Sequence, residues 1–117
     1  MIAKKLFVVL AAVAMLSSRG AWAALYTGNE LLSHCSDSDA VYNNGLCIGF
    51  IAGVSDLHST FVNAEILSQP QVCVADQVTL GQLEEVVVKF LNDNRESLHE
   101  SASGLVMVAL RSAYPCE

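Results

Sequence analysis

The amino-acid sequence predicts an all-α fold, a small four-helix, disulfide-stapled domain with one long central helix. Three observations lead to this prediction. Apolar residues recur at the three- and four-residue intervals of a helix in several segments. Residue pairs that form helix caps stand at the start of two of those segments. Finally, the chain of 117 residues contains four cysteines, an even number that indicates disulfides in a small exported protein.

The first 23 residues have the three regions of a secretory signal peptide. Lys4 and Lys5 form a basic start, an apolar stretch covers residues 6–16, and residues 21–23 read AWA, the A-x-A form of a cleavage site. A membrane anchor is disfavoured because the apolar stretch is shorter than the ~20 residues that span a bilayer. We therefore expect a signal peptide at residues 1–23 and, after its removal, one soluble domain over residues 24–117 in the periplasm.

Two helices are expected in the first half of this domain. Thr27 and Glu30 have the T-x-x-E spacing of a capping box, so a short helix should run from there to about Cys35. From Ala40 onward, apolar residues continue at helical spacing through a much longer segment. This segment is the predicted long central helix, and it should end before Pro70 because proline cannot continue a helix.

The second half of the domain should contain two more helices after a loop at residues 68–78. A T-x-x-Q capping box at residues 79–82 begins the third helix, and the NDN sequence at residues 92–94 should end it. Ser97 and Ser101 both have the character of an N-cap for the fourth helix. That helix should end before the last proline of the chain.

Three glycines of the long helix, in the stretch GLCIGFIAG, are spaced four residues apart. Gly45, Gly49 and Gly53 therefore lie on one face of a helix. Each helical glycine costs ~1 kcal/mol relative to alanine, so a close helix–helix contact is expected to offset that cost. On this interpretation Gly49→Leu should disrupt the fold. The apolar stretch between Asn44 and Ser55 is too short for membrane insertion, which needs ~20 residues.

The four cysteines permit three pairings, and the predicted helices favour one of them. Cys35 ends the first helix and Cys47 lies about two turns into the second, so a turn brings them together. Cys73 precedes the third helix and Cys116 follows the fourth, so an antiparallel pair of helices places them side by side. A Cys47–Cys73 bridge would have to join opposite ends of a helix ~30 Å long. Cys35–Cys73 with Cys47–Cys116 is geometrically feasible but has no local support.

Charge narrows the class of partner. The whole chain has a net charge of −6, and without residues 1–23 three basic residues face twelve acidic ones, a net charge of −9. Nucleic acids and anionic membrane surfaces would repel such a chain, so neither is an expected partner. A basic protein would be attracted to it, although acidity also serves solubility alone.

Residues that could perform chemistry are present but show no catalytic pattern. A cysteine nucleophile would need His34, His58 or His99 as a base, and each cysteine is more simply half of a disulfide. Zinc is disfavoured because there is no C-x-x-C or H-x-x-x-H spacing. Glu84 and Glu85 are interpreted as a solvated helix face. We therefore expect no cofactor, no metal and no catalysis, and interpret the domain as a protein-binding module.

One acidic residue of the long helix, Asp56, is a weak candidate for a contact with a partner. Asp56 is the first acidic residue after the glycine stretch, and it is most simply an exposed helix residue. A contact with a partner is the alternative interpretation.

Three segments together resemble the Tai/Rap-type immunity proteins. They are GLCIGFIAGVSD (45–56), VCVADQVTLGQLEEVVVKFL (72–91) and LVMVALRSAYPC (105–116), and they cover 44 residues in the order and spacing of that family. NDNRES at residues 92–97 departs from the proline-containing loop of many relatives, which shifts His99 from the usual histidine position. The shared positions are mainly core and disulfide residues, so partner-binding residues remain unknown.

The resemblance implies a periplasmic all-α protein that inhibits a peptidoglycan amidase effector of a type VI secretion system. Such proteins block the active site of the effector without turnover, often as dimers, so a homodimer is also implied. Two alternatives remain. A periplasmic acid-stress chaperone would need more basic groups than the three Lys/Arg and three His of the predicted domain. An accessory subunit of an envelope enzyme would co-purify with that enzyme rather than with an amidase.

Overall fold

The computed structural model describes residues 24–37 and 39–117, so the predicted signal peptide lies outside the described residues. Within them the chain forms four α-helices, one short 3-10 helix and no strand. The all-α, four-helix prediction is therefore confirmed for this part of the chain. The elements are α2 (Gly28–Ser36), α3 (Val41–Asn63), α4 (Leu80–Asp93), η1 (Arg95–Ser97) and α5 (Ala102–Ala113).

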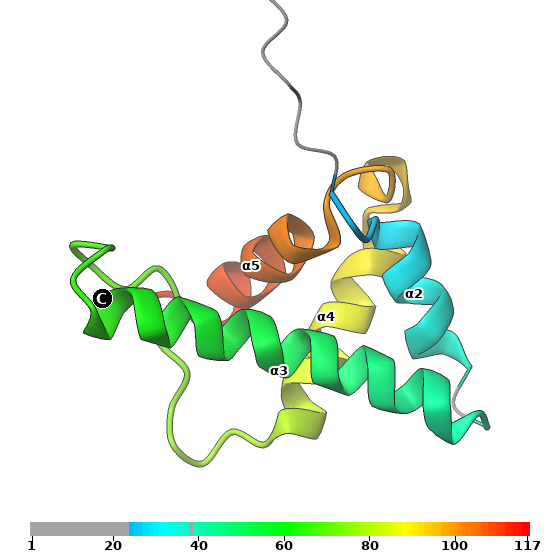
Figure 1. The fold of residues 1–117 in the computed structure, drawn as a ribbon, viewed down its shortest axis with the longest axis horizontal. Helices are drawn as coiled ribbons and strands as arrows, with labels where there is room; N and C mark the ends of the chain where they lie inside the picture. The colour runs from blue at the N-terminus through cyan, green and yellow to red at the C-terminus, as the bar shows by residue number, and fades with distance from the viewer. Residues whose placement is uncertain (1–23, 38) are drawn as a thin grey trace, which may run out of the picture.

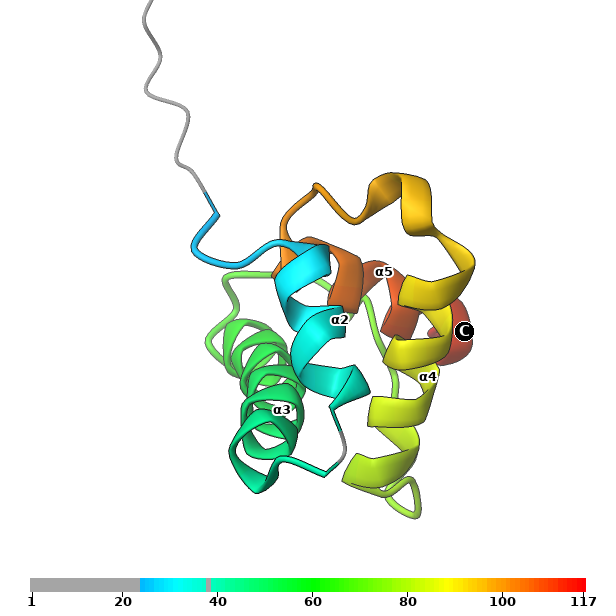
Figure 2. The same ribbon diagram turned by 90° about the vertical axis from the view of Figure 1, so that its right-hand side faces the viewer.

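Helix α3 is the longest element and crosses the full width of the domain (Figure 1). Figure 2 looks almost along α3 and shows α2, α4 and α5 all on one side of it. Each of these three helices contacts α3. One long face of α3 is consequently packed, and the opposite face is left open.

The core lies between α3 and the other three helices. Each helix contributes apolar residues at helical spacing, as the sequence pattern predicts. Leu98, in the segment between η1 and α5, closes the end of this core. The buried apolar residues are Leu31, Leu32, Cys47, Ile51, Leu83, Val87, Leu91, Leu98, Ala102, Leu105, Val106, Ala109 and Leu110.

Both predicted capping boxes are present. At α2 the backbone N–H of Thr27 donates to Glu30 Oε2 at 2.8 Å, and the backbone N–H of Glu30 donates to the Thr27 hydroxyl at 3.4 Å. These hydrogen bonds from Thr27, first from its backbone N–H and then from its hydroxyl, lower the pKa of Glu30 from its ordinary value of 4.5. Thr79 and Gln82 form the equivalent box at α4. Ser101 is the N-cap of α5, which resolves the competition between the two serines.

The long helix ends before Pro70, as the sequence predicts. It stops at Asn63, several residues before Pro70. Glu65 has a left-handed backbone with a φ of 58°, while the N–H of Ile66 donates to Phe61 O at 2.9 Å. This is the hydrogen-bond pattern of a Schellman C-cap, in which glycine normally occupies the left-handed position. Because glutamate stands there instead, the sequence gives no signal for the end at Asn63.

The structure contains the two disulfides predicted from the sequence. Cys35 and Cys47 join α2 to the second turn of α3, with Cα atoms 5.0 Å apart. Cys73 and Cys116 join the segment before α4 to the segment after α5, with Cα atoms 5.1 Å apart. The N–H of Cys73 also donates to Tyr114 O at 2.9 Å. The bridges therefore connect the ends of neighbouring helices, as the predicted helix order requires.

The prediction for the glycines of α3 is wrong. Gly45, Gly49 and Gly53 are exposed, and a Cβ atom added to any of them would meet nothing within 4 Å. Their face lies opposite Cys47 and Ile51, which are fully buried. Spacing places the glycines on a common face, but the larger apolar side chains decide which face turns to the core. No helix of the domain packs against the glycine face.

The glycine that is tightly packed is Gly28, the first residue of α2. It is buried, and an added Cβ would lie 2.5 Å from Leu105 Cδ1 and 3.1 Å from both Cα and O of Leu98. Its N–H donates to Glu100 O at 3.0 Å. The start of α2 therefore lies directly against the η1–α5 connection, and a side chain would separate the two.

By length and composition alone, α3 could cross a membrane. Its 23 residues contain a window of mean hydropathy 1.4, and 17% of that window is buried. In the sequence, the apolar stretch is too short to span a bilayer because polar residues such as Asn43 and Asp56 bound it. The helix is longer than this stretch, since both polar residues lie inside it. In the structure α3 contacts three other helices and is joined to α2 by a disulfide. It thus forms part of the domain core, and the absence of membrane insertion stays a prediction.

Candidate functional site

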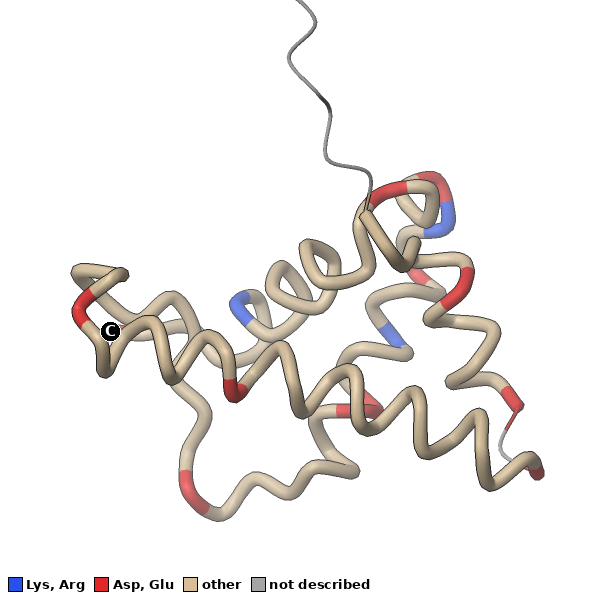
Figure 3. Tube along the Cα trace, in the orientation of Figure 1, with Lys and Arg blue, Asp and Glu red and all other residues tan. Residues whose placement is uncertain are grey.

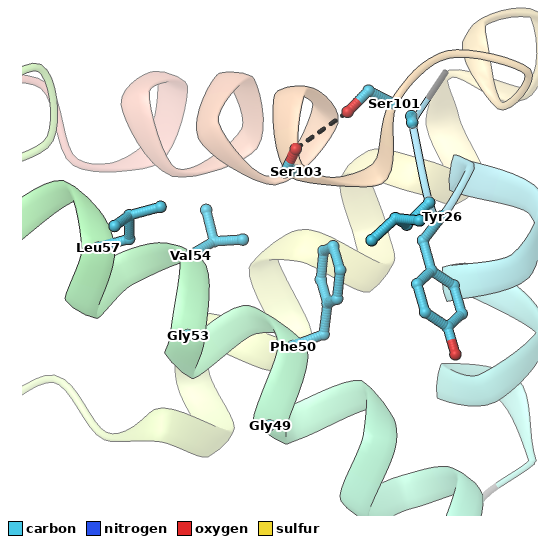
Figure 4. Close-up of a pocket in the computed structure, with 10 residues that line it drawn as sticks. Tyr26, Gly49, Phe50, Gly53, Val54, Leu57, Ser101 and Ser103 are labelled. Carbon is cyan, nitrogen blue, oxygen red and sulfur yellow. Dashed lines mark hydrogen bonds between the residues drawn. The ribbon is translucent and has the colours of Figure 1, made fainter. Parts of the chain in front are cut away.

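An apolar groove runs between α3 and the start of the described chain, with a volume of about 490 Å³. Figure 4 shows Phe50, Val54 and Leu57 projecting from α3 toward α5. Ser101 and Ser103 lie on the opposite edge, at the start of α5. The complete lining is Ala24, Leu25, Tyr26, Gly49, Phe50, Gly53, Val54, Leu57, Ser101 and Ser103. For convenience we name this surface the α3 groove.

The sequence of α3 explains one wall of the groove. Phe50, Val54 and Leu57 follow one another at four- and three-residue intervals, so their side chains lie on one side of the helix. Gly49 and Gly53 stand beside this row and carry no side chain to fill the space. The glycines therefore keep the backbone of α3 open to an approaching molecule.

The other wall is held in place by Tyr26. Its ring packs edge-on against Phe50, with centroids 5.8 Å apart, and against His34 of α2, at 5.9 Å. Its backbone carbonyl accepts a hydrogen bond from Ala102 N at 2.9 Å. The hydroxyls of Ser101 and Ser103 are 2.9 Å apart and hydrogen-bonded to each other. These contacts connect the walls of the groove to α2, α3 and α5.

Apolar side chains around the groove are unusually exposed. Leu25 is 96% exposed and Leu57 53%. Away from the groove, Val41 and Tyr42 at the start of α3 are 88% and 76% exposed. Within α3 the only Asp, Glu, Lys or Arg residue is Asp56 (Figure 3). Contiguous apolar surface bordered by polar residues is typical of protein-binding sites.

A carboxylate lies close to the groove. Asp56 precedes Leu57 on α3 and is exposed, but it lines a different hollow, which it shares with Cys73. Glu30 lines an adjoining hollow that shares Leu25 and Tyr26 with the groove.

The candidate catalytic histidines lie on different elements. His34 is on α2, where its Nδ1 lies 3.2 Å from Asn43 Oδ1. His58 is buried on α3, and its Nε2 accepts a hydrogen bond from the backbone N–H of Gln71 at 3.0 Å. His99 is exposed in the segment before α5.

These positions give the histidines structural contacts but no shared site. All four cysteines are in disulfides. Among residues 24–37 and 39–117, no group of three or more His, Cys, Asp or Glu is placed to hold a metal ion. The described part of the chain therefore contains no assembled nucleophile, base and orienting group.

Sequence reasoning missed the residues that form the groove. Tyr26 and Phe50 are ordinary apolar positions in the sequence, and their contact joins two segments far apart in the chain. Gly49 and Gly53 did attract notice, but for packing inside the domain. The interpretation of Glu84 and Glu85 as one solvated face is also wrong in part. Glu85 is exposed, whereas Glu84 is half-buried against Cys47.

Taken together, fold and groove define a class: a disulfide-linked helical domain with an open apolar groove. The chain belongs to the Rap1a immunity proteins, whose family model matches residues 27–116. That match covers all four described α-helices and both disulfides. No curated protein matches the chain. The resemblance noted from the three sequence segments is thereby confirmed at the level of an immunity protein family.

Proposed function

We propose that this protein is a periplasmic, non-catalytic immunity protein that binds and inhibits a peptidoglycan amidase effector of a type VI secretion system. Membership of the Rap1a immunity proteins supports a role against a secreted effector. The amidase class rests on the sequence resemblance to Tai/Rap-type proteins. Export to the periplasm is supported by the predicted signal peptide and by two disulfides, which persist in oxidising compartments.

The observation that carries this proposal is the α3 groove. Its occupant is an apolar projection of the effector, bordered by basic side chains. Burial of apolar surface supplies ~25 cal/mol per Å², and Phe50, Val54 and Leu57 offer such surface beside an open helix backbone. Glu30, in the adjoining hollow, attracts the basic border, and the net charge of −9 without residues 1–23 speeds the encounter.

Inhibition then follows from steric blockade. The bound domain covers the substrate cleft of the effector, so the peptidoglycan substrate cannot enter. This mechanism needs no bond-breaking step in the immunity protein, and it consumes no cofactor. Its strength depends only on affinity, because each inhibitor molecule neutralises one effector molecule for as long as the complex lasts.

A matched pair of substitutions tests the groove. Leu57 in the groove and Val108 on α5 are both about half exposed, at 53% and 50%, and Val108 does not line the groove. Leu57→Lys should weaken effector binding by roughly 2 kcal/mol or more, about thirtyfold in Kd, since it places an unpaired charge in an apolar contact. Val108→Lys should leave Kd within about twofold. Equal affinities for the two variants would contradict the groove as the contact surface.

The effector class needs a separate experiment. Candidate amidase effectors are directed to the periplasm of a host that co-expresses the full chain, and lysis is followed with purified-enzyme assays alongside. Protection together with loss of amidase activity is expected. Prevention of aggregation at low pH without protection from any amidase would instead favour the chaperone, and stable co-purification with a resident envelope enzyme would favour the accessory subunit.

The homodimer implied by the family resemblance is also part of this proposal. Light scattering on the free protein at tens of micromolar should give twice the mass of the processed chain. A single-chain mass at that concentration would refute the dimer while leaving the effector contact untouched.

A further inference from the structure

The half-buried carboxylate of Glu84 lies against the disulfide that joins α2 to α3. Oε1 of Glu84, on α4, is 3.5 Å from Sγ of Cys47. This sulfur is bonded to Cys35 and carries no hydrogen, so the contact is not a hydrogen bond. Cys47 is fully buried, with 0% of its surface exposed. A negative charge is thus held beside one particular sulfur of the bridge.

The surroundings of the bridge contain little positive charge to offset this carboxylate. His34 precedes Cys35 and shares Asn43 with Asp37, which accepts a hydrogen bond from Asn43 Nδ2 at 2.8 Å. In the described part of the chain the only ion pair joins Lys89 to Asp93, so Glu84 is not part of one.

Reduction by an external thiol has a defined direction at this bridge. The reductant thiolate can reach only Cys35 Sγ, because Cys35 is half-buried and Cys47 is inaccessible. Attack forms a mixed disulfide between the reductant and Cys35. The bond between Cys35 and Cys47 breaks, and its electron pair leaves on Cys47 Sγ as a thiolate. A second thiolate of the reductant then attacks the reductant sulfur of the mixed disulfide. The two reductant sulfurs form a disulfide, and Cys35 leaves as a thiolate.

The leaving thiolate is therefore formed where a negative charge is poorly stabilised. It is buried, and the Glu84 carboxylate lies in contact with it. A leaving thiolate that is poorly stabilised slows exchange. We propose that Glu84 protects the Cys35–Cys47 bridge against reduction by thiols, by repelling the negative charge that must develop on Cys47.

The second disulfide serves as an internal comparison. Cys73 is exposed and Cys116 is half-buried. Under a limiting amount of reductant, the Cys73–Cys116 bridge should open first, which leaves α2 attached to α3.

Two isosteric substitutions separate the local charge from the net charge. Glu84→Gln removes the carboxylate at the bridge, and Glu85→Gln removes the same charge one residue away on the exposed side of α4. The full-length secreted protein is treated with dithiothreitol at pH 7, quenched by alkylation and mapped by peptide mass. Glu84→Gln should speed opening of Cys35–Cys47 about three- to tenfold, and Glu85→Gln by less than about twofold.

Two further measurements guard against a loss of fold. In Glu84→Gln the Cys73–Cys116 bridge should open at its wild-type rate, because that rate would rise if the whole domain unfolded. Glu84→Asp keeps the charge and should stay within about twofold of the wild-type rate at Cys35–Cys47. Equal rates for Glu84→Gln and Glu85→Gln would overturn the proposal. So would acceleration of both bridges by the same factor, or an equal effect of Gln and Asp at position 84.

Discussion

Replacement of Gly28 by alanine should destabilise the domain, although the sequence gives this glycine no special role. An added Cβ would lie 2.5 Å from Leu105 Cδ1 and 3.1 Å from two backbone atoms of Leu98. The leucine side chain can rotate away, but the backbone of Leu98 cannot move cheaply. It is fixed by its own hydrogen bond, in which Leu98 O accepts from Asn29 N at 2.9 Å. The methyl group must therefore push α2 away from the η1–α5 connection.

The magnitude follows from two opposing terms. Forcing a methylene-sized group into a packed contact costs ~1–3 kcal/mol. Alanine recovers less than ~1 kcal/mol through its helix preference, because position 28 is only the first residue of the helix. We expect a net loss of roughly 1–2 kcal/mol, which lowers Tm by about 4–16 °C in a domain of this size.

Two glycines provide controls for this measurement. Gly49→Ala should raise Tm by about 2–8 °C, since its Cβ meets nothing within 4 Å and alanine favours the helix by ~0.5–1 kcal/mol. Gly81 lies in the first turn of α4, and its added Cβ would be 3.9 Å from Thr79 Oγ1, an ordinary contact. Gly81→Ala should therefore not lower Tm.

Thermal unfolding followed by far-ultraviolet circular dichroism gives all four values under one condition. The expected order of Tm is Gly49→Ala highest, wild type and Gly81→Ala next, and Gly28→Ala lowest. A Gly28→Ala protein as stable as wild type would refute the packing argument at α2. A Gly49→Ala protein less stable than wild type would show that the glycine face of α3 is covered, as a dimer contact there would require.

Three other predictions concern the bridges and the caps. Removal of the Cys73–Cys116 bridge, by Cys73→Ser with Cys116→Ser, should lower the free energy of unfolding in urea by ~4 kcal/mol, against ~3 kcal/mol for removal of the other bridge. The difference arises because the bridged cysteines are 43 residues apart in the first case and 12 in the second, and a longer loop loses more chain entropy when it is closed. The pKa of Glu30 is lowered in the folded state, so its contribution to stability is present above the ordinary value of 4.5 and is lost as pH falls through the folded pKa. Glu30→Gln should therefore reduce the fall in stability on acidification from pH 5, and an unchanged Tm–pH curve would contradict this. Thr79→Ala removes the hydroxyl that accepts from Gln82 N at 3.2 Å, which should cost ~1 kcal/mol by the same unfolding assay.

The parts of the fold that are encoded locally could be predicted from the sequence. A capping box needs only two side chains three residues apart, so the starts of α2 and α4 follow from Thr27 and Thr79. Disulfide pairing followed because each bridge joins helix ends that the chain order places together. By contrast, the end of α3 depends on the left-handed backbone of Glu65, which glutamate does not signal.

The site depended on contacts that the sequence does not show. The α3 groove exists because Tyr26 packs on Phe50 and because its carbonyl is held by Ala102. Those partners are far apart along the chain, and only tertiary packing brings them together. Spacing likewise established that Gly45, Gly49 and Gly53 share a face, but it could not say whether another helix covers that face.

The sequence by itself therefore determined the helical class, the cap positions, the disulfide pairing and the family resemblance, because each depends on short-range residue spacing or on the order of motifs. Tertiary structure decided which face of α3 is buried, since Cys47 and Ile51 compete with the glycines for the core and have the larger apolar surface. It also decided that Gly28 is the glycine in close contact and that Glu84 meets a disulfide. A residue's spacing fixes its direction from its own helix, whereas the neighbour it meets is fixed only when all the helices have packed.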